Sequence, residues 1–138
     1  MSVVVRPVSS RRDRREFIEL PYKLHSSSGV WVPPLRLERR LFLMRSQNAF
    51  FSHGDAQLFL AWHNGRVVGR ISAQYDTLYT DRRGAFGFLD FEDAPGIVEP
   101  LLDAAAEWLR ARGRDRMYGP MDFSINDELG VMIEGFER

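Results

Sequence analysis

The segment 86–113, FGFLDFEDAPGIVEPLLDAAAEWLRARG, constrains the fold of this chain more than any other, because it predicts a strand, an acidic turn and a helix in succession. The apolar residues of the predicted helix recur at intervals of three and four, so they form one stripe that must cover a sheet. The stripe consists of Ile97, Val98, Leu101, Leu102, Ala105, Trp108 and Leu109. Gly113 predicts the end of the helix, because Gly supplies a left-handed cap.

Two prolines leave the beginning of this helix open. Pro95 suits a first-turn position, whereas Pro100 would then remove one internal hydrogen bond and bend the helix. The segment 114–123, RDRMYGPMDF, predicts a further strand. Because a helical crossover separates it from the strand at 85–91, we expect the two strands to be parallel.

An antiparallel hairpin is predicted upstream, within the segment 56–77. Asn64-Gly65 is the strongest short hairpin signal, and a β-rich run lies on each side of it. Residues of the second run alternate with a two-residue period, which predicts a strand with one more polar face. The polar face consists of Val68, Arg70, Ser72 and Gln74, and the other of Val67, Gly69, Ile71 and Ala73.

The N-terminal third predicts an edge strand and two helices. The β-branched run before Pro7 suits an edge strand, and the two serines after it suit a helix cap. A helix is expected from Arg11 to about His25, with Pro21 either kinking it or ending its first segment. A second helix is expected to begin near Pro34. After the strand at 114–123, the chain closes with a turn and a short apolar tail.

Length and composition predict one folded domain over residues 1–138. Hydrophobic residues make up 44% of the chain, which is enough for a single core. The sequence has no Cys, which excludes disulfides and thiolate chemistry and favours a cytoplasmic, bacterial-type protein. No apolar run approaches the roughly 18 residues of a membrane span, so we expect no membrane partner.

Charge is unevenly distributed along the chain. Residues 1–47 carry 10 basic and 4 acidic side chains, whereas the remainder carries 9 basic and 15 acidic ones. The asymmetry could mark a nucleic-acid arm around Arg11–Arg15. The alternative, which we prefer, is a solvated helix face, because nucleic-acid modules combine a basic balance with interleaved aromatics. We therefore expect no nucleic acid. The three histidines share no ligand spacing, so we expect no metal either.

The order of predicted elements resembles that of the GNAT acyltransferase superfamily. Four phrases also resemble a family of uncharacterised bacterial GNAT-like proteins: WVPPLRLERRLFL, GDAQLFLAWHNGRVVGRISA, FGFLDFEDAP and GPMDFSINDELGVMIEGF. The resemblance covers nearly the whole chain, and members of that family are longer. It implies an α/β (α+β) fold with a mixed, mostly antiparallel sheet, helices on both faces, and a sheet that lacks its C-terminal strands.

The resemblance also implies acetyl-CoA or another acyl-CoA as cofactor. In that superfamily the fourth strand splays from the fifth, pantetheine lies in the gap, and the pyrophosphate sits on backbone N–H groups where the next helix begins. The site residues implied here are Leu89, Phe91, Asp93, Gly96 and Asn126. The segment 90–100 carries one Gly, no Arg or Gln and several carboxylates, so its charge opposes a pyrophosphate. Asn126 has the alternative role of a turn former.

If the chain is catalytic, the reaction implied is acyl transfer from a thioester to an amine, which needs a general base. Asp90 and Glu92 are the candidate bases, and their alternative role is that of helix-start or edge carboxylates. Two functions therefore stay open: an acyl-CoA-dependent N-acyltransferase, and a non-catalytic scaffold. A scaffold would form a homodimer or dock a partner domain through an exposed sheet edge.

Overall fold

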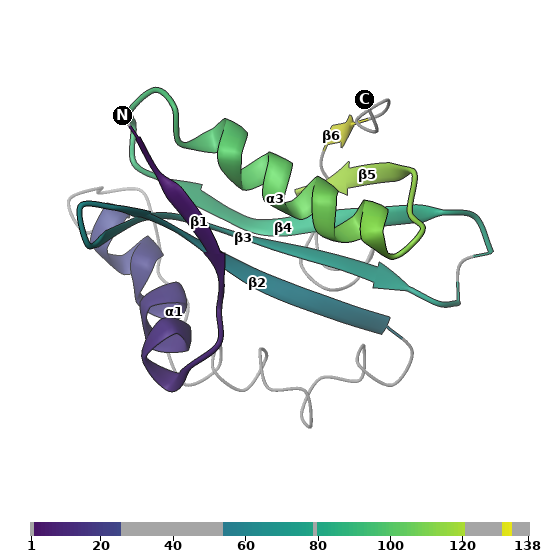
Figure 1. The fold of residues 1–138 in the computed structure, drawn as a ribbon, viewed down its shortest axis with the longest axis horizontal. Coiled ribbons are helices and arrows are strands. Elements are labelled where there is room, and N and C mark those ends of the chain that lie inside the picture. Colours follow the sequence, from purple (N-terminus) through teal and green to yellow (C-terminus); the bar gives the residue numbers. More distant parts are fainter. Residues whose placement is uncertain (1, 26–53, 79, 121–130, 134–138) are drawn as a thin grey trace.

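The computed structural model describes residues 2–25, 54–78, 80–120 and 131–133 of the 138-residue chain. Six strands and two helices follow one another in these ranges (Figure 1). They are β1 (Val4–Pro7), α1 (Arg11–His25), β2 (Gly54–His63), β3 (Arg66–Asp76), β4 (Arg83–Phe91), α3 (Val98–Ala111), β5 (Arg116–Gly119) and β6 (Val131–Ile133). The second helix expected near Pro34 lies outside the described residues.

The strands form one sheet in the order β1-β2-β3-β4-β5-β6. Only β4 and β5 run parallel, and the other four pairs are antiparallel. The parallel pair is the one that α3 connects, as the helical crossover predicted. The mixed, mostly antiparallel α/β sheet is thus confirmed. The apolar tail predicted after β5 contains β6, which pairs with β5 and extends the sheet by a strand that the sequence interpretation had not assigned.

The two helices cover opposite faces of the sheet. A Cβ added at Gly69 would lie 2.8 Å from Leu101 of α3, whereas the guanidinium of Arg70 lies 4.8 Å from the ring centre of Phe17 of α1. Successive strand residues point to opposite faces, so α3 and α1 lie on different sides. Each helix has its own apolar core, one centred on Leu101 and Leu109 and the other on Phe17 and Leu20.

Helix α1 begins with side-chain caps and continues through its proline. The N–H of Asp13 donates to the Oγ of Ser10 at 3.0 Å, and the N–H of Ser9 donates to the carboxylate of Asp13 at 3.2 Å. These bonds satisfy donors of the first turn, as the serine pair predicted. Pro21 lies within the helix, which ends at His25, so the proline does not end it.

Helix α3 has the predicted end and a corrected beginning. Gly113 has a φ of 80°, and its N–H donates to the carbonyl of Arg110 at 3.0 Å, which closes the helix as expected. The helix begins at Val98, so Pro100 lies in its first turn. The expectation of a lost internal hydrogen bond there was wrong, because N–H groups of the first turn have no partner within a helix.

The polar face of β3 is buried. Arg70, Ser72 and Gln74 are 8%, 0% and 3% exposed, because they face the side of the sheet that α1 covers. Ser72 donates a hydrogen bond of 2.9 Å to the side-chain oxygen of Gln74, so this polar pair is satisfied inside the protein. The hairpin turn at Asn64-Gly65 is as predicted, and both residues have positive φ.

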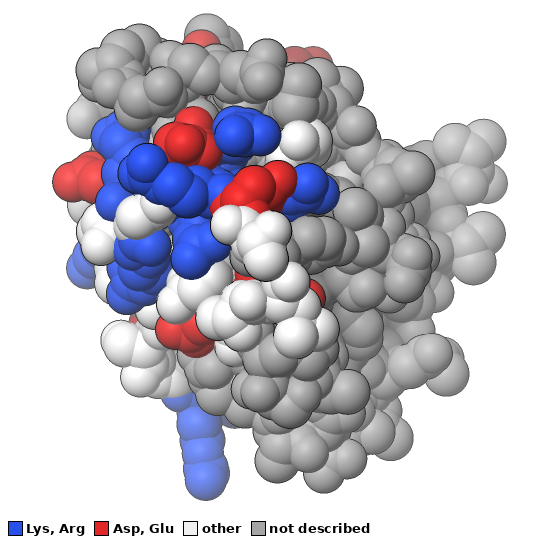
Figure 2. Space-filling view, turned by 90° about the vertical axis from the view of Figure 1, so that its right-hand side faces the viewer, with Lys and Arg blue, Asp and Glu red and all other residues white. Residues whose placement is uncertain are grey.

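The β3–β4 turn and the C-terminal end of α3 lie at the same end of the sheet (Figure 1). The backbone N–H of Asp115 donates to the carbonyl of Arg82 at 2.8 Å and joins the two segments. Figure 2 looks onto this end of the molecule and shows Lys and Arg side chains gathered on part of it. The opposite end of the sheet carries the β2–β3 turn and the start of α3.

Candidate functional site

A bulge interrupts β4 shortly before its end. Ser72 pairs with Gly87 and Arg70 with Asp90, so β4 spans three residue steps where β3 spans two. Phe88, inside the bulge, has a φ of 49°, which is unusual for a residue with a bulky side chain. The extra residue brings the side chains of Asp90 and Glu92 to the α1 face of the sheet. Both candidate bases therefore share one face.

Arg70 connects this strand end to helix α1. Its Nε and Nη2 donate to the same carboxylate oxygen of Asp90 at 3.0 and 2.8 Å, and its Nη1 donates to the backbone carbonyl of Phe17 at 2.8 Å. The guanidinium also lies 4.8 and 5.5 Å from the ring centres of Phe17 and Phe88. The Asp90 carboxylate is therefore part of a buried link between β3, β4 and α1.

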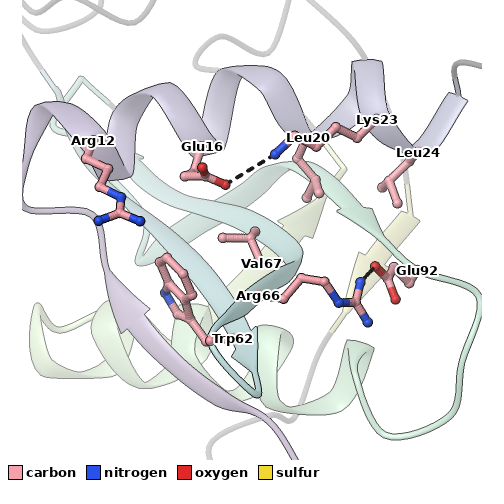
Figure 3. A pocket seen from close by; sticks show the side chains of 10 residues that line it. Arg12, Glu16, Leu20, Lys23, Leu24, Trp62, Arg66, Val67 and Glu92 are labelled. Atoms are coloured by element: carbon pink, nitrogen blue, oxygen red, sulfur yellow. Dashed lines mark hydrogen bonds and ion pairs between the residues drawn. The ribbon is translucent and has the colours of Figure 1, made fainter.

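Glu92 lies one residue beyond β4 and borders a pocket. Its carboxylate forms an ion pair with Arg66, whose side chain is 57% exposed. The pocket has a volume of about 380 Å³ and lies between α1 and the β2–β3 hairpin (Figure 3). Its apolar wall consists of Leu20, Leu24, Trp62 and Val67, and its charged groups of Arg12, Glu16, Lys23, Arg66 and Glu92.

The pairing of β5 with β4 stops well before β4 ends. β5 pairs with Arg83, Gly84 and Ala85, and ends at Gly119. Within the part of the chain that the structure describes, no strand pairs with β4 on this side beyond Ala85. The described pairing of β5 thus covers only the first part of β4.

The N-terminus of α3 follows the end of β4 in the chain. Ile97 is the N-cap residue, and no side chain accepts a hydrogen bond from the first turn of the helix. Gly96, just before it, has a φ of 86°, a conformation that glycine adopts without strain. Uncapped helix N-termini carry N–H donors and a partial positive charge that suit an anion. The turn itself carries the negative charge of Asp93.

The structure separates the predicted cofactor residues. Leu89 packs against the α3 core, whereas Phe91 is 37% exposed at the end of β4. Asp93 is exposed and Gly96 is half-buried in the turn before α3. Asn126 lies outside the described residues. Among the described residues, no three His, Asp or Glu side chains lie together in a way that could hold a metal ion.

Sequence patterns did not predict that Arg66, Arg70 and Trp62 belong to this region. The two-residue alternation in β3 placed Arg70 on a polar face, but its partners lie 20 and 53 residues away in sequence. Arg66 and Trp62 come together with α1 only through the hairpin. Periodicity within one segment does not reveal such long-range neighbours.

Comparison with known proteins finds longer relatives. A bacterial ceramide synthase of Caulobacter vibrioides is 44% identical over 136 residues, which cover 95% of this chain and 35% of that protein. Protein YghO of Escherichia coli is 37% identical over 138 residues, covering 97% of this chain and 35% of that protein. The chain therefore spans about a third of the length of these curated relatives. No family model matches it.

Comparison with solved structures decides the fold. A tandem GNAT protein from the clavulanic acid biosynthesis pathway superposes with a TM-score of 0.63 over 84% of this chain and 35% of that one, at 17% identity. This chain has the GNAT fold. The resemblance to the GNAT superfamily, which was based on the order of predicted elements, is thereby confirmed at the level of the fold. The resemblance implies that pantetheine would lie beside β4, on the side that faces β5. It implies that the pyrophosphate would lie at the turn before α3.

Neither of the two described helices has the length and apolar character needed to cross a bilayer.

Proposed function

We propose that this chain contributes to acyl-CoA-dependent N-acyl transfer. The observation that carries the proposal is the uncapped N-terminus of α3, which follows the part of β4 beyond Ala85 that no described strand pairs with on the β5 side. A strand edge can pair with the amide groups of pantetheine, and a helix N-terminus suits a pyrophosphate. The GNAT fold of this chain supports the same assignment.

The reaction would join an amine to the acyl group of a thioester. The amine nitrogen attacks the thioester carbonyl and forms an amide bond, the carbon–sulfur bond breaks, and the thiol of CoA leaves with a proton. A base must take the proton that the amine loses. Glu92 suits this role better than Asp90, because Glu92 borders the pocket and its partner Arg66 is largely exposed. Ion pairs of exposed side chains are weak and open readily.

We propose an amine with a long apolar chain as the acceptor. The pocket beside Glu92 has an apolar wall and a size within the usual range for small-molecule sites, about 300 to 1,000 Å³. Its charged rim carries the carboxylates of Glu16 and Glu92, which form ion pairs with Lys23 and Arg66, so an ammonium group must displace one of these cations to reach a carboxylate. The name of the Caulobacter relative points to the same substrate class, because a ceramide is the N-acyl derivative of a long-chain amine.

Calorimetric titration tests donor binding before any turnover is sought. We expect acetyl-CoA or a long-chain acyl-CoA to bind with a dissociation constant at or below about 100 μM, and desulfo-CoA to bind similarly if the pantetheine and pyrophosphate dominate. Thiol release with a long-chain amine would then be followed. Glu92→Gln should lower its rate about 10²-fold or more, while Glu107→Gln, an exposed carboxylate on α3, should leave it unchanged.

A non-catalytic scaffold is the second candidate, and the ion pairs favour it. Asp90 and Glu92 both have arginine partners, so each carboxylate has a structural role that needs no substrate. The scaffold would associate through a sheet edge such as β1, at the end of the strand order. Absence of any acyl-CoA binding, together with a dimer in sedimentation that Val4→Lys dissolves, would favour the scaffold and overturn the enzyme proposal.

A further inference from the structure

Arginines from three segments meet at the end of the sheet opposite the candidate acyl-CoA site. They are Arg82 and Arg83 after the β3–β4 turn, Arg110 and Arg112 at the end of α3, and Arg114 and Arg116 leading into β5. We call this set the arginine patch, and Figure 2 shows the basic side chains gathered there. Acidic side chains lie among these arginines, with Asp76 and Asp81 near the β3–β4 turn and Asp115 between Arg114 and Arg116.

Several of these guanidinium groups are held in place by aromatic rings. Arg112 lies 3.8 Å from the ring centre of Trp108 and donates to the carbonyl of that residue at 3.1 Å. Arg114 lies 4.7 Å from the ring centre of Tyr75. Such contacts fix the charges before a partner arrives, so less side-chain entropy is lost on binding.

The arginine patch also contains ion pairs. Arg83 donates to both carboxylate oxygens of Asp81, and Arg82 and Arg116 both approach Asp115, at 3.8 and 3.4 Å. Asp115 is thus the ion-pair partner of two arginines. Arg82 keeps 65% of its side chain exposed and Arg116 keeps 40%. Both guanidinium groups therefore stay accessible to solvent in spite of their ion pairs.

An exposed leucine lies at the same end of the molecule. Leu78, in the β3–β4 turn, is 69% exposed, the highest value among the large hydrophobic residues that the structure describes as exposed. Its N–H donates to the carboxylate of Asp76 at 2.8 Å, which fixes the turn that presents it. This end of the molecule therefore carries both an exposed apolar side chain and exposed arginines.

We propose that the arginine patch and Leu78 dock the domain on the surface of a bilayer that contains anionic lipids. Basic clusters bind the negative surface of such a bilayer, and an exposed apolar side chain enters its interface. Nucleic acid fits less well, because the rings of Trp108, Tyr75 and Tyr118 already carry guanidinium groups and offer no stacking platform for bases. An acidic protein would leave Leu78 without an apolar contact.

Docking on a bilayer surface needs no membrane-spanning segment. The lack of a long apolar run, from which no membrane partner was expected, therefore does not exclude it. The charge distribution along the chain did not indicate a basic surface in this part of the protein, because the C-terminal 91 residues carry 9 basic and 15 acidic side chains. Folding brings six of those nine together.

Vesicle co-sedimentation tests the proposal on this chain. Vesicles of phosphatidylcholine with about a third phosphatidylglycerol should sediment the protein at low salt, and pure phosphatidylcholine vesicles should not. Arg82→Gln/Arg112→Gln should weaken binding at least tenfold, since each basic residue near such a surface strengthens binding about fivefold. Leu78→Ser should weaken binding while leaving its salt dependence unchanged. Circular dichroism of each variant checks that it is folded.

Arg14→Gln/Arg15→Gln is the matched control, because it removes the same charge from two exposed positions on α1. It should bind the anionic vesicles as the unaltered protein does. Equal binding to neutral vesicles, no binding to either kind, or an equal loss in the control would overturn the proposal. Tighter binding to a DNA or RNA duplex than to the anionic vesicles, lost in the Arg82 and Arg112 variant, would overturn it in favour of nucleic acid.

Discussion

Arg70 donates two hydrogen bonds to a single carboxylate oxygen of Asp90, at 3.0 and 2.8 Å, on the face of the sheet that α1 covers. The side chains of the two residues are only 10% and 24% exposed. Removing one partner of a mostly buried ion pair destabilises the folded protein. Substitutions in this pair therefore test how much it contributes to holding the end of β4 in place.

Asp90→Ala should lower the free energy of unfolding by about 3 kcal/mol, because it removes the Asp90 carboxylate from the mostly buried guanidinium of Arg70. Arg70→Met/Asp90→Ala should be more stable than the single Asp90 variant, because no buried charge then remains. Urea unfolding of the two variants measures both values. If the double variant is the less stable of the two, the uncompensated charge is not the cause.

Gly119→Ala should lower the free energy of unfolding by about 1 to 3 kcal/mol. A Cβ at this position would lie 2.4 Å from the ring of Phe86, which is buried. In a Phe86→Leu background the same change should cost less. Gly65→Ala should lower the free energy of unfolding by the same amount in both backgrounds. Its effect arises from the φ of 75° at this position, since no atom lies within 4 Å of an added Cβ. Thermal denaturation of the six proteins gives these differences.

Asp81→Asn should destabilise the protein at neutral pH but not in acid. The hydrogen bond from the guanidinium of Arg83 lowers the pKa of Asp81 below its ordinary value of 3.8. The folded pKa is the lower one, so the stabilisation is present above the unfolded pKa and is lost as the pH falls through the folded pKa. Melting temperatures of the two proteins should converge as the pH falls below 3.8. A gap that persists in acid would refute this explanation.

Asp93→Asn should strengthen acyl-CoA binding about two- to fivefold. The carboxylate of Asp93 is exposed in the turn before α3 and opposes the negative charge of a pyrophosphate near the helix N-terminus. Asp103→Asn removes the same charge from an exposed position further along α3 and should change affinity less. Calorimetry at low salt compares the three proteins. Equal effects of the two changes would exclude a specific site at the α3 N-terminus.

Local patterns in the sequence predicted the elements that depend on near neighbours. Asn64-Gly65 predicted the hairpin because its two residues alone satisfy the positive φ values of the turn. The three-and-four spacing of α3 and its Gly113 cap likewise need only residues within one helix. The parallel pairing of β4 with β5 followed from the crossover between them.

The candidate site depends on contacts between distant segments, so the sequence predicted less of it. Asp90 and Glu92 were placed at the end of the strand, but their partners Arg70 and Arg66 lie on β3, 20 and 26 residues earlier. The burial of the polar face of β3 depends on α1 covering it. The bulge at Phe88 had no sequence signal, since no glycine marks the residue with positive φ.

That bulge divides β4 into two stretches whose side chains follow opposite phases. Before it, even-numbered residues such as Gly84 and Phe86 face α3, whereas after it the even-numbered Asp90 and Glu92 lie on the α1 side. Removing one residue here would turn both carboxylates toward the apolar core under Ile97 and Leu101. An alignment that treats β4 as one uninterrupted strand would therefore compare the carboxylates with the wrong positions of any relative that lacks the extra residue.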